Sequence, residues 1–508
     1  MRFGFPQIVN LFGVCLLICI LQLARLTLFS HEYKTQLSAR EMNQDLYVLL
    51  KEVKLHSAFA ALDEHRVNII ENKLEPFLYR VDGPIDTQDF YAEIIQLLVT
   101  LDDPGLSITS PTKPLPVLPF TLRPLSDTWL ALDKEGVPID PEHPFITHID
   151  GIPLTRWELL SQSFISAPLK HSISERVHWL SQIALLRRSM GMANQNEVIL
   201  SLSDNMDSSV QLPLPLIESR AAYQTSVFDK EISKHAVNTG QSSQYIEITN
   251  LSHYDNNKAL KAELETGIKQ AVTIIDISHA AERSDQLFQF IARNYADPEP
   301  NNHAASHLIA LGQYRRSPHF KSDFLRPLGF IPYSEFNFFE QVEFAQTSQS
   351  IPDAKEKPFG LWYGRRTPIA QGSKQAETEN NNLLGVIIGP QCRRECEWLA
   401  YYAKSLSRVT LIGEKTTGDI GRHYGFTLPN SGISVQLTAS LTYDMQGQLL
   451  SSVGITPDIP LPINEELELQ GLISLITTEF RQPNLYAETA RNKKVNAREL
   501  VIPISIRK

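Results

Sequence analysis

The side chains most capable of chemistry gather in one short segment of the C-terminal half. Residues 391–397 read QCRRECE and follow the apolar run LLGVIIG. Cys392 and Cys396 stand four residues apart, a spacing that a turn before a helix can close into a disulfide. In an oxidising compartment this disulfide is the favoured interpretation. Two buried thiols are the next alternative, and a cysteine nucleophile with His423 or His279 as its base is the third.

Two arginines, Arg393 and Arg394, lie inside the same segment at the start of a predicted helix. Cations at this end oppose the helix dipole, so the simplest interpretation is a pair of solvated side chains. The functional alternative is a pocket for a carboxylate, such as a peptide C-terminus, because the guanidinium fork matches carboxylate oxygens. The chain has no Cys-x-x-Cys pair, and we predict no metal site and no cofactor.

The elements that position this segment are strands and helices in alternation. From residue 244 onward, buried strands read QYIEITNL, AVTIIDIS, LLGVIIG and RVTLIG, and amphipathic helices read NKALKAELETGIKQ, DQLFQFIARNY and ECEWLAYYAKSL. Continuous apolar strands separated by helices are typical of a parallel sheet built from right-handed βαβ units. The sequence therefore predicts an α/β core in which the segment follows one strand and opens the next helix.

Two further regions precede this core. Residues 35–102 place apolar residues at three-to-four spacing, which predicts helices. After a proline-rich connector, residues 120–215 predict short strands interrupted by the helix SISERVHWLSQIALLRRSM. This second region is expected to form a compact module of its own.

The N-terminus carries an unbroken apolar run, LFGVCLLICIL, over residues 11–21. It has the length of a signal-peptide core, but no small-residue cleavage site follows it. Read over residues 8–29, it could span a bilayer if Arg25 reaches the interface. We therefore expect an uncleaved anchor with the soluble body outside the cytoplasm, in the periplasm, and hold secretion after signal cleavage as the alternative.

Composition excludes several classes of protein. The chain has 508 residues, too many for one ordinary domain, with 42% apolar and 20% charged residues, as in globular proteins. Its net charge of −10 argues against a nucleic-acid binder. Four cysteines exclude a disulfide scaffold.

The block from 383 to 462 resembles the core of the tail-specific (C-terminal-processing) serine peptidases, including their tricorn-core branch. In that family a buried strand leads to a Ser-Ala-Ala-Glu-type turn, then to R-x-x-x-x-G-E-x-T-x-G, and later to G-[IV]-x-P-D-[IV]. Glu397 matches the glutamate of the turn, and residues 454–459 (GITPDI) match the last motif. The middle motif is matched by Arg408, Gly413, Glu414, Thr416 and Gly418.

The resemblance implies a catalytic serine three residues before Glu397, and Arg394 stands there instead. A guanidinium cannot form an acyl-enzyme. One branch of the family places a lysine base directly after the middle motif, where this chain has Asp419. Another branch places a histidine after the aspartate that ends the helical domain, where this chain has Gly105. The sequence therefore predicts a degenerate site with no confirmed catalytic residue.

A third departure lies after the central strand. The family usually reads D-L-R-x-N-x-G-G there, but this chain ends the stretch with Glu282 and Arg283. Charged side chains in place of glycines restrict the backbone and crowd the cleft. With Arg393 and Arg394, these two residues are the predicted peptide-contacting positions.

The resemblance implies a multidomain α+β protein with a ClpP/crotonase-like α/β peptidase core, an inserted PDZ-like domain and an N-terminal helical domain. We expect a mobile loop at 366–382. The predicted regions are an anchor or signal segment at 1–34, a helical domain at 35–110, a PDZ-like domain at 118–217, the core at 222–465 and a tail at 466–508.

Three functions remain open at this stage. The first is a degenerate relative that binds peptides or unfolded protein segments, because PDZ-like modules capture peptides by strand addition. The second is an active peptidase of the same family that uses Cys396 or Cys392. The third is a non-peptidase enzyme of the crotonase-like fold, although nothing in the sequence resembles an acyl-CoA site.

Overall fold

The computed structural model describes ten stretches of the chain. They are residues 33–78, 83–125, 128–204, 208–218, 243–295, 308–321, 323–351, 358–366, 382–461 and 469–481. The expected anchor at 8–29, nearly all of the expected loop at 366–382 and the tail beyond 481 lie outside these residues. None of the helices in the described stretches is long and apolar enough to span a bilayer.

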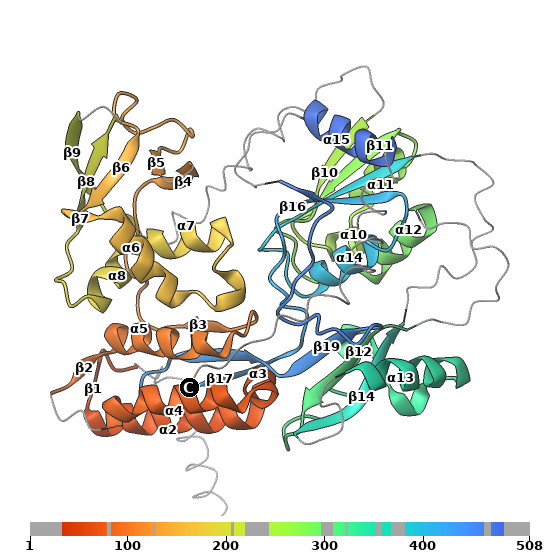
Figure 1. Cartoon of the computed structure of the whole chain (residues 1–508), viewed down its shortest axis with the longest axis horizontal. Helices are drawn as coiled ribbons and strands as arrows, with labels where there is room; N and C mark the ends of the chain where they lie inside the picture. The colour runs from red at the N-terminus through yellow and green to blue at the C-terminus, as the bar shows by residue number, and fades with distance from the viewer. Residues whose placement is uncertain are drawn as a thin grey trace, which may run out of the picture.

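The N-terminal region is helical, as its apolar spacing predicts. It contains α2 (Ala39–His56), α3 (Ala58–Leu62), α4 (Glu64–Leu78) and α5 (Thr87–Leu98). Ser38 caps α2 and forms a capping box with Glu41, which fixes where the helix begins. Leu46, Leu49 and Val53 bury one face of α2 in the core of this region. The helices lie along the lower edge of the molecule in Figure 1.

The second region is a separate module of short antiparallel strands and helices (Figure 1). Its strands follow the order β4-β5-β6-β8-β9, with β7 beside β6. Their bounds are β4 (Thr121–Leu125), β5 (Thr128–Leu132), β6 (Phe145–Ile149), β7 (Ile152–Pro153), β8 (Glu197–Ser203) and β9 (Ser209–Pro215). The helices are α6 (Leu154–Ser161), α7 (Ile173–Ser181) and α8 (Ile183–Ser189), with two short 3-10 turns, η2 (Gln162–Phe164) and η3 (Ala167–Leu169). Trp157 is fully buried at the centre of this module.

The third region is built on the parallel sheet that the alternating pattern predicts. The order is β10-β11-β15-β16-β20, and every neighbouring pair is parallel. The strands are β10 (Ser243–Glu247), β11 (Val272–Asp276), β15 (Leu383–Ile388), β16 (Val409–Gly413) and β20 (Ile459–Pro460). The helices are α10 (His253–Asn256), α11 (Lys258–Gly267), α12 (Asp285–Tyr295), α14 (Glu395–Ala403) and α15 (Leu469–Arg481). The expected mixed α/β architecture is confirmed.

The described residues contain two further antiparallel sheets of three or more strands, which the sequence analysis did not anticipate, and a two-stranded antiparallel sheet of β1 (Gln36–Leu37) and β2 (Ile85–Asp86). One has the order β13-β14-β12-β19, with β13 (Phe330–Pro332), β14 (Phe359–Arg366), β12 (Leu308–Arg315), β19 (Ser440–Asp444) and the helix α13 (Phe338–Ser350). The other has the order β17-β18-β3, with β17 (His423–Thr427), β18 (Ser434–Thr438) and β3 (Ser107–Thr109). Because β3 follows the helical region, this sheet joins the helical region to strands more than 300 residues later in the chain.

Candidate functional site

The turn between β15 and α14 has the geometry expected of a nucleophile turn, with Arg394 at its apex. Arg394 is the N-cap of α14 and adopts φ 57° and ψ −113°. Its N–H donates to the Asp419 carbonyl at 2.7 Å, and its carbonyl accepts from the Trp398 N–H at 3.1 Å. A left-handed backbone at a residue other than glycine is strained and persists only where its surroundings enforce it. The sharp turn is therefore present, but it carries a guanidinium instead of a hydroxyl.

A disulfide joins Cys392 to Cys396 across this turn, with their Cα atoms 5.2 Å apart. Both cysteines are fully buried. Neither sulfur is a free thiol, so neither offers a thiolate to a substrate in this structure.

Glu397 lies in the first turn of α14, directly after the Arg394 turn. Its carboxylate is completely buried and accepts hydrogen bonds from the hydroxyls of Thr416 and Thr417 and from the N–H groups of Gly418 and Asp419, all at 2.9–3.1 Å. Burial, aided by the nearby Asp419 carboxylate, raises the pKa of Glu397 to about 8. Glu397 therefore ties α14 to the loop that follows β16, which is a structural role.

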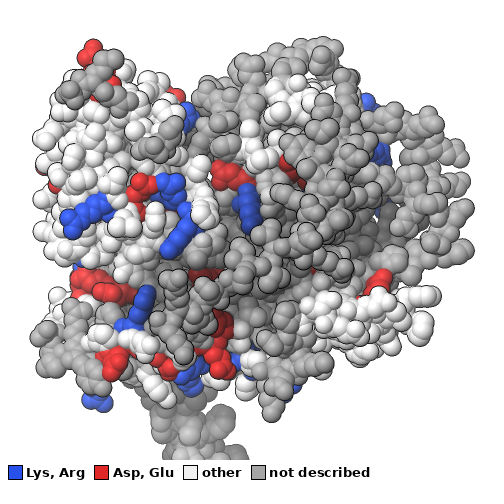
Figure 2. All heavy atoms as spheres, viewed as in Figure 1, with Lys and Arg blue, Asp and Glu red and all other residues white. Residues whose placement is uncertain are grey.

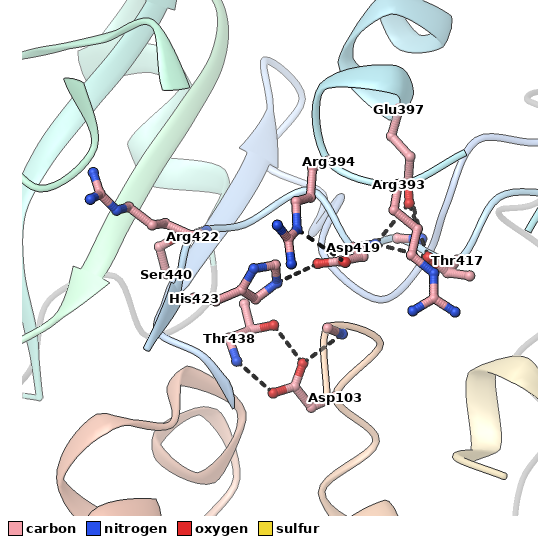
Figure 3. A network of polar contacts seen from close by, with 12 residues as sticks. Asp103, Arg393, Arg394, Glu397, Thr417, Asp419, Arg422, His423, Thr438 and Ser440 are labelled. Atoms are coloured by element: carbon pink, nitrogen blue, oxygen red, sulfur yellow. Dashed lines mark hydrogen bonds and ion pairs between the residues drawn. The ribbon is translucent and has the colours of Figure 1, made fainter. Parts of the chain in front are cut away.

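His423 and Asp419 form a buried pair beside Arg394. The Nε2 atom of His423 lies 2.6 Å from Oδ1 of Asp419, and the two side chains are only 8% and 3% exposed. Arg394 is 51% exposed, and its Nε lies 3.9 Å from Oδ2 of Asp419. Figure 3 shows the guanidinium of Arg394 directed toward this pair.

Gly105 explains why His423 can lie there. A methyl group added at Gly105 would come within 2.4 Å of Nε2 of His423 and within 2.3 Å of the Thr438 hydroxyl. The imidazole from β17 therefore fills the space into which a side chain at residue 105 would project. The resemblance implies a histidine at 105, so this chain supplies an imidazole to the same space from another strand.

Asp103 accepts hydrogen bonds from the residues around His423. Its buried carboxylate accepts from the Gly105 N–H at 2.9 Å, the Thr438 N–H at 2.8 Å and the Thr438 hydroxyl at 2.5 Å (Figure 3). Burial raises the pKa of Asp103, while the bonds from Thr438 favour its ionised form. The carboxylate thus pins the end of the helical region to β18.

The hydroxyls drawn in Figure 3 are engaged away from the imidazole. Thr417 donates to Glu397, Thr438 donates to Asp103, and Ser440 accepts from the Arg422 N–H. The site therefore combines a histidine–aspartate pair with a cation.

The remaining predicted residues are divided between solvent and structural contacts. His279 and Glu282 are exposed, and Glu282 adopts φ 63° despite its side chain. Arg283 bonds to Asp285 and to the Pro327 carbonyl, so it serves the local structure. Arg393 pairs with Glu175 of α7 at 3.0 Å, which connects the turn to the antiparallel module.

No group of histidine, cysteine, aspartate or glutamate side chains within the described stretches has the geometry of a metal site.

Comparison with protein families identifies the core. Residues 337–461 match the model of Peptidase family S41. This part of the chain is therefore similar to the S41 peptidases. The match includes the Arg394 turn, Glu397 and the His423–Asp419 pair, and it confirms the resemblance to the tail-specific peptidases.

Solved structures extend the similarity in fold to most of the chain. Mature CPAF is 12% identical over 88% of this chain and 98% of its own, with a TM-score of 0.55. CPAF complexed with lactacystin is 13% identical over 87% of this chain and 98% of its own, with a TM-score of 0.53. No curated protein sequence matches the chain. The S41-like region therefore lies within a larger fold shared with CPAF.

Proposed function

We propose that this protein is a membrane-anchored, extracytoplasmic member of the S41 peptidase fold that binds peptides and does not cleave them. Residues 8–29 would form the anchor, and the antiparallel module at 118–217 would act as a PDZ-like domain. The bound partners would be peptides or unfolded protein segments.

Arg394 is the observation that carries this proposal. It occupies the strained apex of the turn, where a peptidase of this family needs its serine, and the disulfide removes the two neighbouring thiols from consideration. A half-exposed guanidinium at this apex can bind a carboxylate through paired hydrogen bonds. The side chain is 51% exposed although its Nε pairs with Asp419 at 3.9 Å, so part of the guanidinium faces solvent and is available to a ligand.

The surface also supports a peptide partner. In the described part of the face shown in Figure 2, acidic and basic residues are interspersed. Nucleic-acid binders instead gather their cations into continuous patches or stripes. Together with the net charge of −10, this distribution favours peptide partners over nucleic acids.

The proposal is tested by measuring cleavage and binding on the full-length protein in detergent or nanodiscs. We expect no cleavage of β-casein, and we expect binding of short peptides with a free C-terminal carboxylate. Arg394→Ala should weaken peptide binding by roughly tenfold or more, because one charge-assisted bidentate contact is lost. Arg316→Ala, which removes another exposed arginine, is the matched control.

Cleavage of casein by the protein would overturn the non-catalytic proposal and would favour the alternative of an active S41 peptidase with another nucleophile. Equal loss of binding in both arginine variants would instead overturn the role of Arg394. Unchanged binding in Arg394→Ala would do the same.

A further inference from the structure

The outer face of α13 is apolar and exposed. Phe338 and Phe339 are 72% and 63% exposed, and Val342, one turn further on, is 42% exposed. Tyr333, from the 3-10 turn η7 (Tyr333–Glu335), is also 42% exposed, and its ring lies 4.8 Å from that of Phe344 in α13. Exposed apolar patches of this kind mark sites of protein or membrane contact. We call Tyr333, Phe338, Phe339 and Val342 the α13 patch.

The charged residues of α13 are engaged away from this patch. The sequence of the helix contains two charged residues, Glu340 and Glu343. Glu340 is fully buried and accepts hydrogen bonds from Arg366, and Glu343 accepts one from the Leu308 N–H at 3.1 Å. Figure 2 shows a broad uncharged area at the lower right, where α13 lies in Figure 1. The α13 patch therefore offers a partner apolar contact without charge.

The helix α13 belongs to the same outer layer as the helical region. Phe59 of α3 and Phe344 of α13 share one apolar cluster with residues of β19. Ser57 ends α2 and caps α3, so these two helices are continuous in the chain. In Figure 1, α2, α3 and α13 lie on the lower side of the molecule, below the parallel sheet. A flat partner on this side can contact both α2 and α13.

The proposed anchor leads into this layer. It would end at residue 29, and four steps of chain, at most about 14 Å, separate that residue from Tyr33. The Tyr33 ring packs against Gly432, beside the start of β18. From there β18 and β19 lead to Met445, whose carbonyl accepts from the Thr347 hydroxyl of α13 at 3.0 Å. This run spans no more than about 40 Å, so a bilayer that holds the anchor extends as far as α13.

The outer face of α2 suits the surface of a bilayer. Arg40, Tyr47 and Lys51 are exposed at spacings of seven and four residues, which places them on one side of the helix. Tyr47 is 71% exposed. Tyrosine, arginine and lysine are the side chains that meet phospholipid headgroups at membrane interfaces. This face therefore fits headgroup phosphates, while the aromatic α13 patch fits the boundary between headgroups and acyl chains.

We infer that the α13 patch enters the bilayer surface and forms a second membrane contact besides the anchor at residues 8–29. The inference rests on the membrane anchor in the proposed function. Because the anchor keeps the bilayer beside the body, the bilayer has a high effective concentration at the patch. One anchor leaves the body able to rotate and tilt, whereas two separated contacts fix its orientation. The second contact therefore also fixes the direction in which the Arg394 site faces.

The test uses full-length protein in nanodiscs of phosphatidylcholine and phosphatidylglycerol, with or without brominated acyl chains. The fluorescent amino acid dansylalanine replaces Phe338 or, as the matched control, Leu159 of α6, which is 71% exposed. Brominated chains quench a fluorophore only when it reaches the acyl region. We expect severalfold stronger quenching and a blue-shifted emission at position 338, and neither effect at position 159.

A double variant tests whether the aromatic rings insert the patch. Phe338→Ser combined with Phe339→Ser removes two exposed rings, and dansylalanine in place of Val342 reports the position of the helix. The variant should remain in nanodiscs through its anchor and lose most of the quenching at position 342. Leu159→Ser, with the same probe at 342, should keep the quenching of the otherwise unaltered protein.

Equal quenching at positions 338 and 159, or unchanged quenching at 342 in the double serine variant, would overturn the second contact and leave the anchor intact. Failure of the protein to enter nanodiscs would instead overturn the anchor, and with it the proposed membrane location. Self-association in detergent that protects the 338 probe from aqueous iodide would show that a second copy covers the patch, which would also overturn the inference.

Discussion

The absence of a side chain at residue 105 determines where the imidazole of His423 lies. His423 comes within 2.4 Å of the place that a Cβ at 105 would occupy, and it is held there by Asp419. Arg394, whose Nε lies 3.9 Å from Asp419, keeps a strained backbone at the position where the resemblance implies a nucleophile. At the scale of residues, the site thus holds an oriented imidazole beside a guanidinium.

Gly105→Ala should therefore destabilise the protein by about 1–3 kcal/mol, the usual cost of overpacking a buried site. The measurement is chemical denaturation of the full-length protein. In a His423→Ala background, the same glycine substitution should cost less, because the added methyl group then meets Thr438 and Asp419 but no longer the imidazole. Additive effects in this double-mutant cycle would show that His423 does not fill the space beside Gly105.

Glu397 should make stability fall as the pH rises. Its pKa of about 8 in the native state lies above its ordinary value of 4.5, so the native state holds the proton more tightly than the unfolded state between these values. The stabilisation that protonated Glu397 gives to the native state is complete below about pH 4.5 and is lost as the pH rises through about 8. Between these values the free energy of unfolding falls by at most ~1.4 kcal/mol per pH unit.

Glu397→Gln cannot ionise and should remove this slope, which urea denaturation between pH 5 and 8.5 measures. The variant should also lose about 1–3 kcal/mol, because its NH2 group brings two hydrogens toward the four donors, where the protonated acid brings one. The difference in free energy of unfolding between wild type and Glu397→Gln separates the effect of Glu397 from that of the other titrating groups. A difference that does not vary with pH would contradict the prediction.

At the scale of elements, the disulfide joins the turn after β15 to the first turn of α14. α14 is almost entirely buried between the parallel sheet and its neighbours. The start of α14 must therefore be held in position. Glu397, in the first turn of α14, helps to hold it by accepting hydrogen bonds from the N–H groups of Gly418 and Asp419. The disulfide and the Glu397 carboxylate together enforce the strained conformation of Arg394.

Cys392→Ser combined with Cys396→Ser should destabilise the protein by about 2 kcal/mol, the value expected for a loop this short. Thermal unfolding of wild-type protein in the presence and absence of reductant is the companion measurement. Reductant should lower the melting temperature of the wild type only. An equal response of both proteins would argue against the disulfide.

Elements with strong local patterns could be predicted from the sequence. The helices of residues 39–98 follow their apolar spacing, and β11, β15 and β16 follow their continuous apolar runs. The sheets of β12, β14 and β19 and of β3, β17 and β18 were missed, because their pairing joins distant segments and is not encoded by the period of any one strand. The same non-local pairing brings Gly105 to His423, so the sequence could only suggest His423 as a weak candidate.

At the scale of the whole molecule, His56 lies at the junction between the helical region and the S41-like core. It is fully buried at the end of α2, with its ring 3.9 Å from that of Tyr424 and 5.2 Å from that of His319. Glu52 lies 3.1 Å from its Nε2 and also accepts a hydrogen bond from Tyr424. Burial lowers the pKa of His56, so its neutral form is favoured in the folded protein.

Acid should therefore weaken this junction. Below the ordinary pKa of about 6.5, the unfolded state binds a proton that the native state resists, so stability falls with decreasing pH. His56→Gln cannot titrate and should lack this loss, as measured by denaturation at pH 7 and pH 5. His65→Gln, at an exposed histidine of α4, should retain the wild-type response. A wild-type response in His56→Gln would assign the acid sensitivity to another group.

The bonds between Asp103 and Thr438 span 335 residues of sequence. During synthesis, the carboxylate of Asp103 emerges from the ribosome long before the strand that will receive it. Until β18 arrives, β3 has an unpaired edge, and the space beside Gly105 lacks the imidazole that fills it. The candidate site is therefore completed only after more than four-fifths of the polypeptide has been made, and a nascent or truncated chain that ends before β18 exposes this edge to chaperones and proteases.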